Sequence, residues 1–288
     1  MKTDGFRVRP GDEDALRKHP PDRTPQLDGK DVAAERLQRG IERLRERQDL
    51  LYAQDRYALL LVFQGMDGAG KDSAIKHVMS GVSPQSTEVH AFKAPSSDEQ
   101  DHDYLWRVSR VLPARGRIGI FNRSHYEEVL TVRVHPQILA AEQLPADCVT
   151  RHIWRHRFKD INAFERHLFH NGTIIRKFFL HVSRSEQRRR LLQRLDDPTK
   201  NWKFRSGDLD DRAKWKEFMS AYAEALAATS RDHAPWYVIP ADHKWFAHTL
   251  IAEIIVKTLE DLDLSFPRLT ASRRRELARA RRRLVGDR

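Results

Sequence analysis

Short apolar runs alternate along the chain with longer segments in which apolar residues recur every three or four positions. The short runs predict β-strands and the longer segments predict amphipathic helices. Strands that alternate with helices pair in parallel and are covered by helices on both faces. The pattern therefore predicts an α/β fold, a three-layer α/β/α sandwich around a five-stranded, mainly parallel sheet. We expect the strands at residues 58–63, 87–92, 117–121, 173–182 and 236–239.

Helical periodicity fills most of the remaining chain. Ser97 and Gln100 have the spacing of a capping box, and Pro113 ends the helix that begins there. Residues 199–207 are expected to form an exposed basic loop. The predicted helices cover residues 31–55, 71–80, 97–112, a stretch around 158–168, 185–195, 208–229 and 245–262.

The same pattern divides the chain into three parts. Residues 1–30 are rich in Pro, Asp and Arg and lack periodicity, so we expect an extended N-terminal arm. Residues 31–265 are expected to form one domain with a helical lid at about 185–230. Residues 266–288 form a basic C-terminal tail whose arginine runs are typical of a solvated helix. Binding of a polyanion or a partner subunit is the alternative for this tail.

A glycine-rich turn between the first strand and its helix carries the clearest chemical signal. Gly65, Gly70 and Lys71 have the spacing of a phosphate-binding loop. Glycines let successive backbone N–H groups converge on one anion, and the following helix directs its positive end to the same place. Asp72 stands where nucleoside-triphosphate enzymes carry a Ser or Thr hydroxyl for Mg²⁺. The residues expected to bind phosphate are Gly65, Met66, Gly68, Ala69, Gly70, Lys71, Asp72 and Lys76.

Asp67 lies inside this loop, where its carboxylate would repel phosphate unless a cation lies between them. Metal ligation is therefore the interpretation we favour, and a local Asx-turn is the alternative. The carboxyl end of the third strand is the second candidate region, because ligands of parallel sheets collect there. It carries Asn122, which can bind Mg²⁺ through its oxygen, and Arg123, which can grip phosphate. Glu127 and Glu128 follow as candidates for metal or acceptor binding, or as a solvated helix start.

Arginines at residues 188–194 form the third cluster. Arg190 and Arg194 are four residues apart and share one helix face. A helix that presents arginines over a phosphate site is typical of kinase lids, and an ordinary solvated basic face is the alternative. Of the 14 histidines, the pairs His152 with His156 and His167 with His170 have chelating spacing. No third ligand of matching geometry accompanies them, so zinc is not expected.

Overall composition restricts the classes of partner. The formal net charge is +11 and the pI is near 9.9, which favours polyanions such as inorganic polyphosphate, nucleic acid or anionic membranes. No apolar run approaches the length of a membrane span, and the N-terminus lacks the apolar core of a signal peptide. Cys148 is the single cysteine, so we expect no internal disulfide and a cytoplasmic location.

Several strings of the sequence, in order, resemble the polyphosphate kinase 2 family. The match extends from about Asp31 to Leu262, with Gly68 where that family usually has alanine. The matching strings are Gly65–Asp72, Phe92–Ser96, Asp101–Arg107, Phe121–Glu128, Asn171–Thr173, Asp197–Lys203 and Pro240–Trp245. The resemblance implies a P-loop kinase-like domain over residues 31–265. It also implies transfer of phosphate between inorganic polyphosphate and a nucleotide, with Mg²⁺, or Mn²⁺ in its place.

The resemblance also assigns residue roles. Asp67 matches the metal-binding aspartate and Lys71 the loop lysine, while Arg123 and Arg190 match arginines that contact phosphates. Asn122 together with Glu127 resembles the subgroup that phosphorylates both AMP and ADP. The expected catalytic residues are Asp67, Lys71, Arg123, Arg190 and Glu127. Asp67 and Asn122 are expected to bind the metal, and Arg194 to bind polyphosphate. The residues expected to bind the nucleotide are Asn122, Arg123, Glu127 and Lys93.

We therefore expect a reversible transfer of the terminal phosphate of polyphosphate to AMP or ADP, with guanine nucleotides as further candidates. An ATP-dependent nucleoside monophosphate kinase is the alternative, against which Asp72 argues. A non-catalytic polyanion or nucleic-acid binder is a second alternative, resting on the basic tail alone. Neither nucleic acid nor a membrane is the expected partner, and a homodimer or homotetramer is the expected assembly.

Overall fold

Five parallel strands form a single sheet in the order β2-β3-β1-β4-β5. The computed structural model describes residues 1–27 and 29–286, so residue 28 of the predicted arm and residues 287–288 of the predicted tail lie outside it. The strands are β1 (Ala58–Gln64), β2 (Thr87–Ala91), β3 (Ile118–Asn122), β4 (Thr173–His181) and β5 (Trp236–Pro240). The predicted α/β fold class is confirmed, and every strand pairing is parallel.

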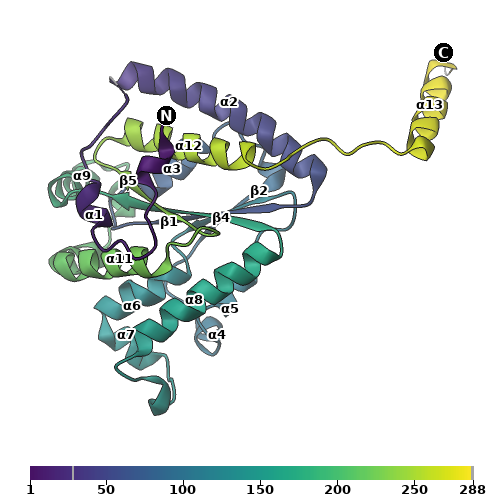
Figure 1. Ribbon diagram of the computed structural model, residues 1–288. Helices are drawn as coiled ribbons and strands as arrows, with labels where there is room; N and C mark the ends of the chain where they lie inside the picture. The colour runs from purple at the N-terminus through teal and green to yellow at the C-terminus, as the bar shows by residue number, and fades with distance from the viewer. Residues whose placement is uncertain (28, 287–288) are drawn as a thin grey trace.

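Helices cover both faces of this sheet (Figure 1). Helices α2 (Lys30–Gln54), α3 (Lys71–Val78) and α12 (Lys244–Glu260) pack together on one face. Helices α8 (Ile153–His170) and α11 (Trp215–Thr229) lie on the other face, and α6 (Thr131–Val134) packs against α11. The remaining helices are α1 (Ala15–Lys18), α4 (Ser97–Gln100), α5 (Trp106–Ser109), α7 (Pro136–Ala141), α9 (Arg184–Asp196), α10 (Gly207–Ala213) and α13 (Ala271–Gly286), with 3₁₀ turns at η1 (Thr3–Phe6), η2 (Pro84–Ser86), η3 (His125–Val129), η4 (Ala146–Cys148) and η5 (Asn201–Lys203).

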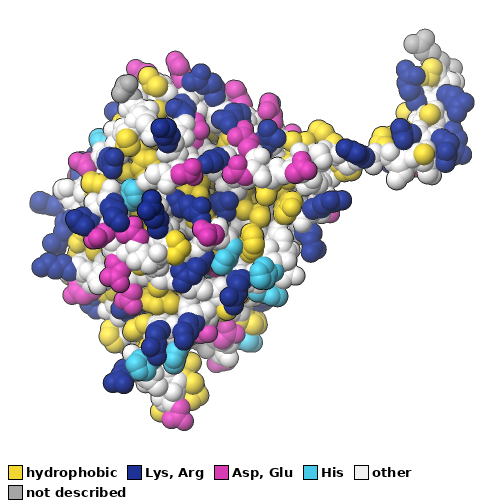
Figure 2. Space-filling view, viewed as in Figure 1, with side chains coloured by type: hydrophobic (Ala, Val, Ile, Leu, Met, Phe, Trp, Pro, Cys, Tyr) yellow, Lys and Arg dark blue, Asp and Glu magenta, His cyan; other side chains and the backbone are white. Residues whose placement is uncertain are grey.

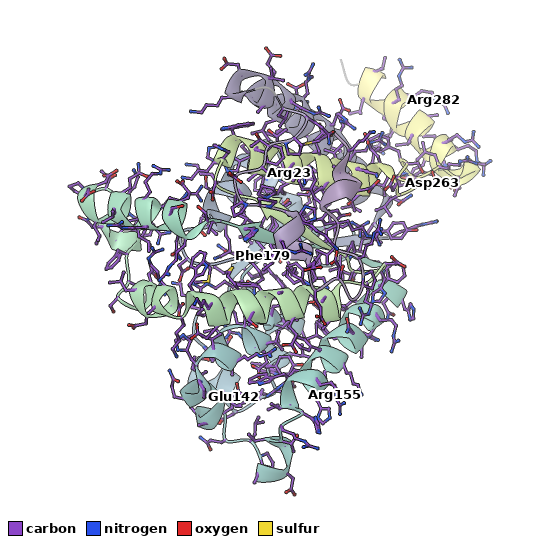
Figure 3. The ribbon with its side chains drawn as sticks, turned by 60° about the vertical axis from the view of Figure 1, so that its left-hand side comes forward. Arg23, Glu142, Arg155, Phe179, Asp263 and Arg282 are labelled. Carbon is purple, nitrogen blue, oxygen red and sulfur yellow. The ribbon has the colours of Figure 1, made fainter. Side chains whose placement is uncertain are left out.

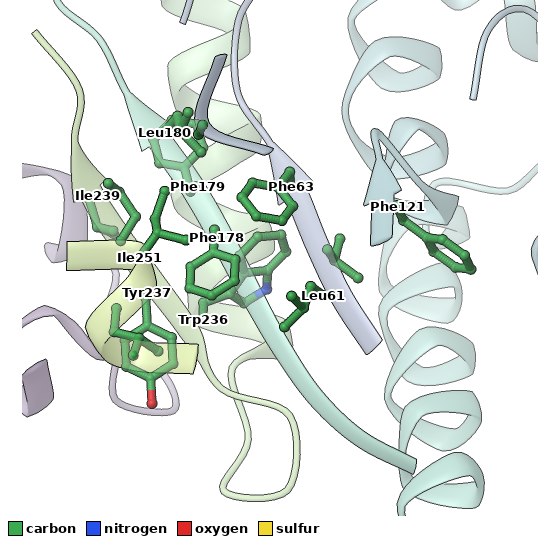
Figure 4. Close-up of a cluster of buried hydrophobic side chains, with 14 of the residues drawn as sticks. Leu61, Phe63, Phe121, Phe178, Phe179, Leu180, Trp236, Tyr237, Ile239 and Ile251 are labelled. Atoms are coloured by element: carbon green, nitrogen blue, oxygen red, sulfur yellow. The ribbon is translucent and has the colours of Figure 1, made fainter. Parts of the chain in front are cut away.

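The central strands form the core of the protein. Every residue of β1 is buried, as a strand covered on both faces requires. Phe63 of β1 and Phe178 of β4 lie with their ring centroids 5.0 Å apart, and Trp236 at the start of β5 is 2% exposed (Figure 4). This packing fixes the carboxyl ends of β1, β3 and β4 side by side, where the candidate site residues follow.

Within residues 1–27, the N-terminal segment packs on the body. Phe6 and Val8 are buried, and the Val8 amide donates to the Trp236 carbonyl oxygen at 2.9 Å. Arg7 forms an isolated antiparallel bridge with Tyr237 at the open edge of β5. The segment thus covers an edge strand that would otherwise expose its backbone groups. Sequence reasoning missed this because an irregular segment has no period to read.

Two helix predictions are wrong in detail. Residues 97–112 form two short helices, α4 and α5, because the Asp103 side chain accepts the amide of Leu105 and turns the chain between them. The capping box is made by Ser96 and Glu99, one residue before the predicted pair. The predicted helix 208–229 is likewise divided, into α10 and α11 at Lys214, whose Nζ donates to the Val134 carbonyl oxygen at 3.1 Å.

The predicted lid at about 185–230 contains two different kinds of helix. Helix α9 buries only Gln187, Arg190 and Leu191 and lies at the surface. Helix α11 instead buries a broad face from Phe218 to Thr229 and belongs to the core layer. Within the predicted lid, α9 and α10 are therefore the helices that lie at the surface.

The basic tail extends away from the body. Helix α13 begins after an extended segment that leaves α12 near Asp263, and its described residues are all exposed (Figure 3). Arginines cover it densely, whereas basic and acidic side chains are mixed over the visible face of the body (Figure 2). Among the described residues, none of the helices combines the length and the apolar character that crossing a membrane requires.

Candidate active site

The candidate site lies at the carboxyl edge of the sheet, where ligands of parallel sheets collect. The phosphate-binding loop follows β1, Asn122 ends β3, and α9 follows β4. Strand β1 pairs with both β3 and β4, so these three connections are neighbours. The sheet order thus brings together three clusters that lie far apart in the sequence.

The loop glycines are required by both conformation and space. Gly65 has φ +150° and Gly68 has φ +82°, values that side-chain-bearing residues rarely adopt. A Cβ on Gly65 would lie 2.9 Å from the Leu180 carbonyl oxygen, and one on Gly68 would lie 3.3 Å from Gln187. The loop is therefore pressed against β4 on one side and α9 on the other.

Lys71 occupies the first turn of α3 and is almost fully buried. Its Nζ donates to the carbonyl oxygens of Gly65 at 2.5 Å and Met66 at 3.3 Å. Burial lowers the pKa of Lys71, and the charge of Asp67 opposes that effect. The lysine thus folds back on the loop it belongs to, and binding phosphate requires it to exchange these carbonyls for phosphate oxygens.

Arg190 holds the loop from the side of α9. Its Nε donates to Glu186 at 2.7 Å, and its Nη1 donates to the carbonyl oxygens of Gly68 and Ala69 at 3.0 and 2.8 Å. Its Nη2 donates to the carbonyl oxygens of Ala241 and Asp242 at 2.6 and 3.0 Å. Protein acceptors therefore engage all five N–H groups of the guanidinium. Arg190 is one of the predicted phosphate ligands; in the structure it is buried, and its contacts fix the shape of the loop.

Asp67, Arg123 and Glu127 form the charged centre of the site. Arg123 Nη2 lies 2.6 Å from Asp67 Oδ1, and Nη1 lies 3.6 Å from Glu127 Oε2. Burial alone would raise the pKa of Asp67, but the charges of Lys71 and Arg123 outweigh it and lower the pKa to about 2. The charge of Glu127, followed by that of Asp67, raises the pKa of Arg123. Asp67 is consequently ionised and Arg123 protonated at any physiological pH.

Arg123 is held in an unusual backbone conformation. Its φ of +62° lies in the left-handed region, which a non-glycine residue adopts at a cost of about 1–3 kcal/mol. Its amide donates to the Phe63 carbonyl oxygen at 3.0 Å, which extends the β1–β3 pairing by one residue. The strained turn directs the side chain toward the loop after β1.

Glu127 is oriented by two donors that the sequence did not reveal. Gln64 Nε2, at the end of β1, donates to Oε1 at 3.1 Å. Thr131 Oγ1 donates to Oε2 at 2.6 Å. Glu128, its neighbour, points the other way: it is buried beside Arg157 at 2.9 Å, and burial raises its pKa to about 8. The structure thus separates the two glutamates that the sequence presented as equal.

The two predicted metal ligands lie at the ends of adjacent strands. Asn122 donates through Nδ2 to Asp72 at 2.5 Å, and Asp67 contacts Arg123. No group of three or more His, Cys, Asp or Glu side chains suited to a metal occurs within residues 1–27 and 29–286. One ionised carboxylate beside an amide still fits Mg²⁺, which is commonly held by one or two carboxylates, water and substrate phosphates.

Arg194 reaches the site from the last turn of α9. Its Nη1 lies 3.1 Å from Asp208 Oδ2, and Asp208 is buried. Burial, together with the charge of Asp67, raises the pKa of Asp208 to about 6. Gln187, fully buried on the same helix, donates to the Asp67 carbonyl oxygen at 2.8 Å. Helix α9 is therefore connected to the loop by two polar side chains, Gln187 and Arg190.

Two predicted ligands lie apart from this centre. Lys76 is exposed one turn further along α3, and Lys93 is exposed in the loop after β2. The carbonyl oxygen of Lys93 accepts from Arg107, so its loop is held by α5. His152, the N-cap of α8, and His156 have ring centroids 6.5 Å apart.

Sequence reasoning missed Gln64, Thr131, Gln187 and Asp208. Gln64 carried a readable signal, since a polar residue that ends a buried apolar strand tends to serve the site at its edge. Gln187 lies one turn before Leu191 on the buried face of α9, where a polar residue indicates a specific partner. Asp208 and Thr131 gave no signal, because their partners come from distant parts of the chain.

Comparison with known proteins agrees with this geometry. The sequence model of the family described as polyphosphate kinase 2 matches residues 27–267. The chain is 48% identical to the ADP-polyphosphate phosphotransferase of Rhodopseudomonas palustris over 286 residues, covering 99% of each. It is 44% identical to the AMP/ADP-polyphosphate phosphotransferase of Meiothermus ruber, covering 91% of this chain and 94% of that one.

A solved structure shares the fold. The crystal structure of polyphosphate kinase 2 from Arthrobacter aurescens superposes with a TM-score of 0.85 at 38% identity, covering 95% of this chain and 94% of that one. The family model matches far more than half of the chain, and the fold agrees with that of the solved structure. The chain therefore belongs to the polyphosphate kinase 2 family.

Proposed function

We propose that the enzyme transfers the terminal phosphate of inorganic polyphosphate to an adenine nucleotide, forming ADP from AMP or ATP from ADP, and that the reaction is reversible. The observation that carries this proposal is the charged centre beside the phosphate-binding loop, in which Arg123 lies between Asp67 and Glu127. The relatives in R. palustris and M. ruber are named for the same chemistry.

Positioning and charge neutralisation account for most of the work in phosphoryl transfer. The loop N–H groups and the start of α3 receive the donor phosphates, and Lys71 contributes a charge once it leaves the loop carbonyls. Arg123, permanently protonated, offsets the negative charge that accumulates between donor and acceptor. An oxygen of the acceptor phosphate is already a competent nucleophile, so no strong general base is needed.

A divalent ion fits this arrangement, with Mg²⁺ as the expected ion and Mn²⁺ as its substitute. Asp67 would hold it through its ionised carboxylate, and Asn122 through its amide oxygen. When bound, the ion neutralises phosphate charge and orients the donor. Arg123 contacts the same carboxylate at 2.6 Å, so Asp67 would serve both the ion and the arginine.

The acceptor preference rests on the same edge of the sheet. Glu127 and Asn122 resemble the subgroup that phosphorylates both AMP and ADP, whereas the two relatives differ in their names on this point. We therefore propose that both nucleotides are accepted. A cytoplasmic location and a homodimeric or homotetrameric assembly complete the proposal, and light scattering of the purified protein tests the assembly.

The decisive assay incubates purified enzyme with polyphosphate, Mg²⁺ and either AMP or ADP, and follows the nucleotides by chromatography. We expect ADP and ATP from AMP, and ATP from ADP. Omission of polyphosphate, with ATP offered as donor to AMP, is the control for an ordinary monophosphate kinase. Absence of phosphorylated product at every donor length would refute the proposed function.

A further inference from the structure

A pocket of about 360 Å³ opens between α2, α3 and α12, beside the phosphate-binding loop. Ser73, two residues after Lys71, lines it. Two residues along a helix correspond to about 200° of rotation, so Ser73 and Lys71 face opposite sides of α3. The pocket is therefore separate from the side of the loop that meets Asp67 and Arg123.

Positive charge surrounds the pocket mouth. Lys30 is the first residue of α2 and Lys244 is the first residue of α12, and both line the pocket. Neither helix has a side-chain hydrogen bond at its N-cap, and the positive dipole ends of both helices lie beside these lysines. None of the described residues that line the pocket is an Asp or Glu.

Two histidines form one wall. His77 and His248 stack with ring centroids 4.6 Å apart, and His248 Nε2 lies 3.4 Å from Ser73 Oγ. His77 Nδ1 lies 2.8 Å from the Ser73 carbonyl oxygen, so that nitrogen carries a proton. Burial, followed by the charges of His77, Lys244 and Arg190, lowers the pKa of His248 to about 4. Positive groups therefore surround a buried imidazole that is itself uncharged.

The rest of the lining is mainly apolar. Trp245 and Leu37 form it together with small residues of α2. A bare phosphate chain would gain nothing from an indole and a leucine, whereas a nucleotide would bury its base against them and keep its phosphates at the lysines. A volume of several hundred Å³ with a few convergent polar groups is also typical of a small-molecule site.

We propose that this pocket is a second nucleotide site, with the base on the Trp245 wall and the phosphates at Lys30, Lys244 and the starts of α2 and α12. It goes beyond the proposed transfer reaction, since nothing in that reaction requires a nucleotide here. A nucleotide in this pocket would contact α3 and α12 on the side that faces away from Asp67 and Arg123. A nucleotide bound there is thus placed to sense the energy state of the cell while the acceptor site turns over.

The test counts bound ADP by equilibrium dialysis without polyphosphate, so that it does not depend on turnover. The background is Arg123→Ala, which weakens the acceptor site. We expect ADP to remain bound in that background and to weaken at least tenfold when Lys30→Ala and Lys244→Ala are added. The matched control adds Lys159→Ala and Lys216→Ala, two exposed lysines outside the pocket, and should leave binding unchanged.

Trp245→Ala separates the two kinds of phosphate ligand. It should weaken ADP at least tenfold while leaving inorganic triphosphate unaffected, provided the melting temperature shows that the variant is folded. Triphosphate and ADP equally insensitive to Trp245→Ala would overturn the nucleotide assignment. Equal ADP binding in the lysine variants and their control would overturn the site itself. If the wild-type enzyme shows no turnover but binds ADP in this pocket, the proposed function alone is contradicted.

Discussion

Two charged clusters share the short segment from Arg123 to Glu127 and behave in opposite ways. In the core, Lys177 Nζ lies 2.5 Å from Glu165 and donates to the Tyr126 hydroxyl at 2.7 Å and the Thr229 carbonyl oxygen at 2.9 Å. At the sheet edge, Arg123 meets Asp67 and Glu127, with about a third of its side chain exposed.

The difference lies in what completes each cluster. Lys177 and Glu165 are excluded from water, and the protein supplies their partners, so the core cluster can only hold structure. The edge cluster keeps water contact on each of its three side chains. Its partners can be exchanged for phosphates or a metal ion without leaving a buried charge unpaired. Tyr126, three residues after Arg123, connects the two, because the core cluster fixes the turn on which the edge cluster is built.

The largest expected effect is on catalysis. Arg123→Ala should lower kcat/KM with ADP and polyphosphate by about 10³-fold or more, since an arginine at a transferring phosphate contributes on that scale. Arg123→Lys should recover only part of the loss, because a lysine lacks the planar fork. The unfolding free energy should fall by no more than about 1 kcal/mol, because the ion pairs of Arg123 keep contact with water. Steady-state kinetics and urea denaturation measure the two quantities, and a large fall in stability would show that the edge cluster is structural.

Breaking the core cluster should have the reverse signature. Glu165→Ala leaves Lys177 charged and unpaired, and should lower the unfolding free energy by about 3–5 kcal/mol. The double replacement of Glu165 and Lys177 by leucine and methionine should be much less destabilising, because it removes both charges. Denaturation curves of the single and double variants provide the comparison. If the single and double variants lose equal stability, the unpaired charge of Lys177 is not the cause of the destabilisation.

Loss of one orienting hydrogen bond should have a smaller effect. Thr131→Val removes the hydroxyl that donates to Glu127 and preserves the shape of the side chain. We expect a roughly fivefold to tenfold rise in KM for the acceptor nucleotide, which corresponds to the loss of one typical hydrogen bond, with kcat little changed. Thr150→Val, whose hydroxyl accepts the His152 amide outside the site, is the control. A fall in kcat with KM unchanged would assign Glu127 to the transition state rather than to acceptor binding.

The smallest expected effect is a pH dependence of the unfolding free energy that arises from Asp208, beside the edge cluster. The pKa of Asp208 is raised to about 6 in the folded protein, compared with about 3.9 in the unfolded chain. The folded state binds more protons between these values, so this group makes stability fall as pH rises from 4 through 6. Asp208→Asn should remove that contribution. Denaturation midpoints at pH 4.5 and 7 should therefore differ less in the variant than in wild type, and equal differences would contradict the assignment.

The sheet and the loop were readable from the sequence, for a physical reason. Strand β1 is apolar throughout because it is buried on both faces, and Gly65, Gly70 and Lys71 follow at a fixed local spacing. Arg123 and Glu127 were found because the end of a central parallel strand is where ligands bind. Local periodicity and local motifs therefore predicted the five strands and most of the charged centre.

Contacts across the fold were not readable. The N-terminal segment lacks a period, and its role depends on the open edge of β5 two hundred residues later. The contacts of Arg190 could not be predicted, because its acceptors are backbone carbonyls, which have no sequence signature. The break between α4 and α5 came from one Asp side chain, which periodicity averages away.

The guanidinium of Arg190 has a mechanical consequence. It bonds at once to the phosphate-binding loop, to the turn after β5 and to its own helix. Any displacement of α9 must therefore pull on Gly68 and Ala69 or break their bonds to Arg190. The position of α9 and the curvature of the loop are thus mechanically coupled.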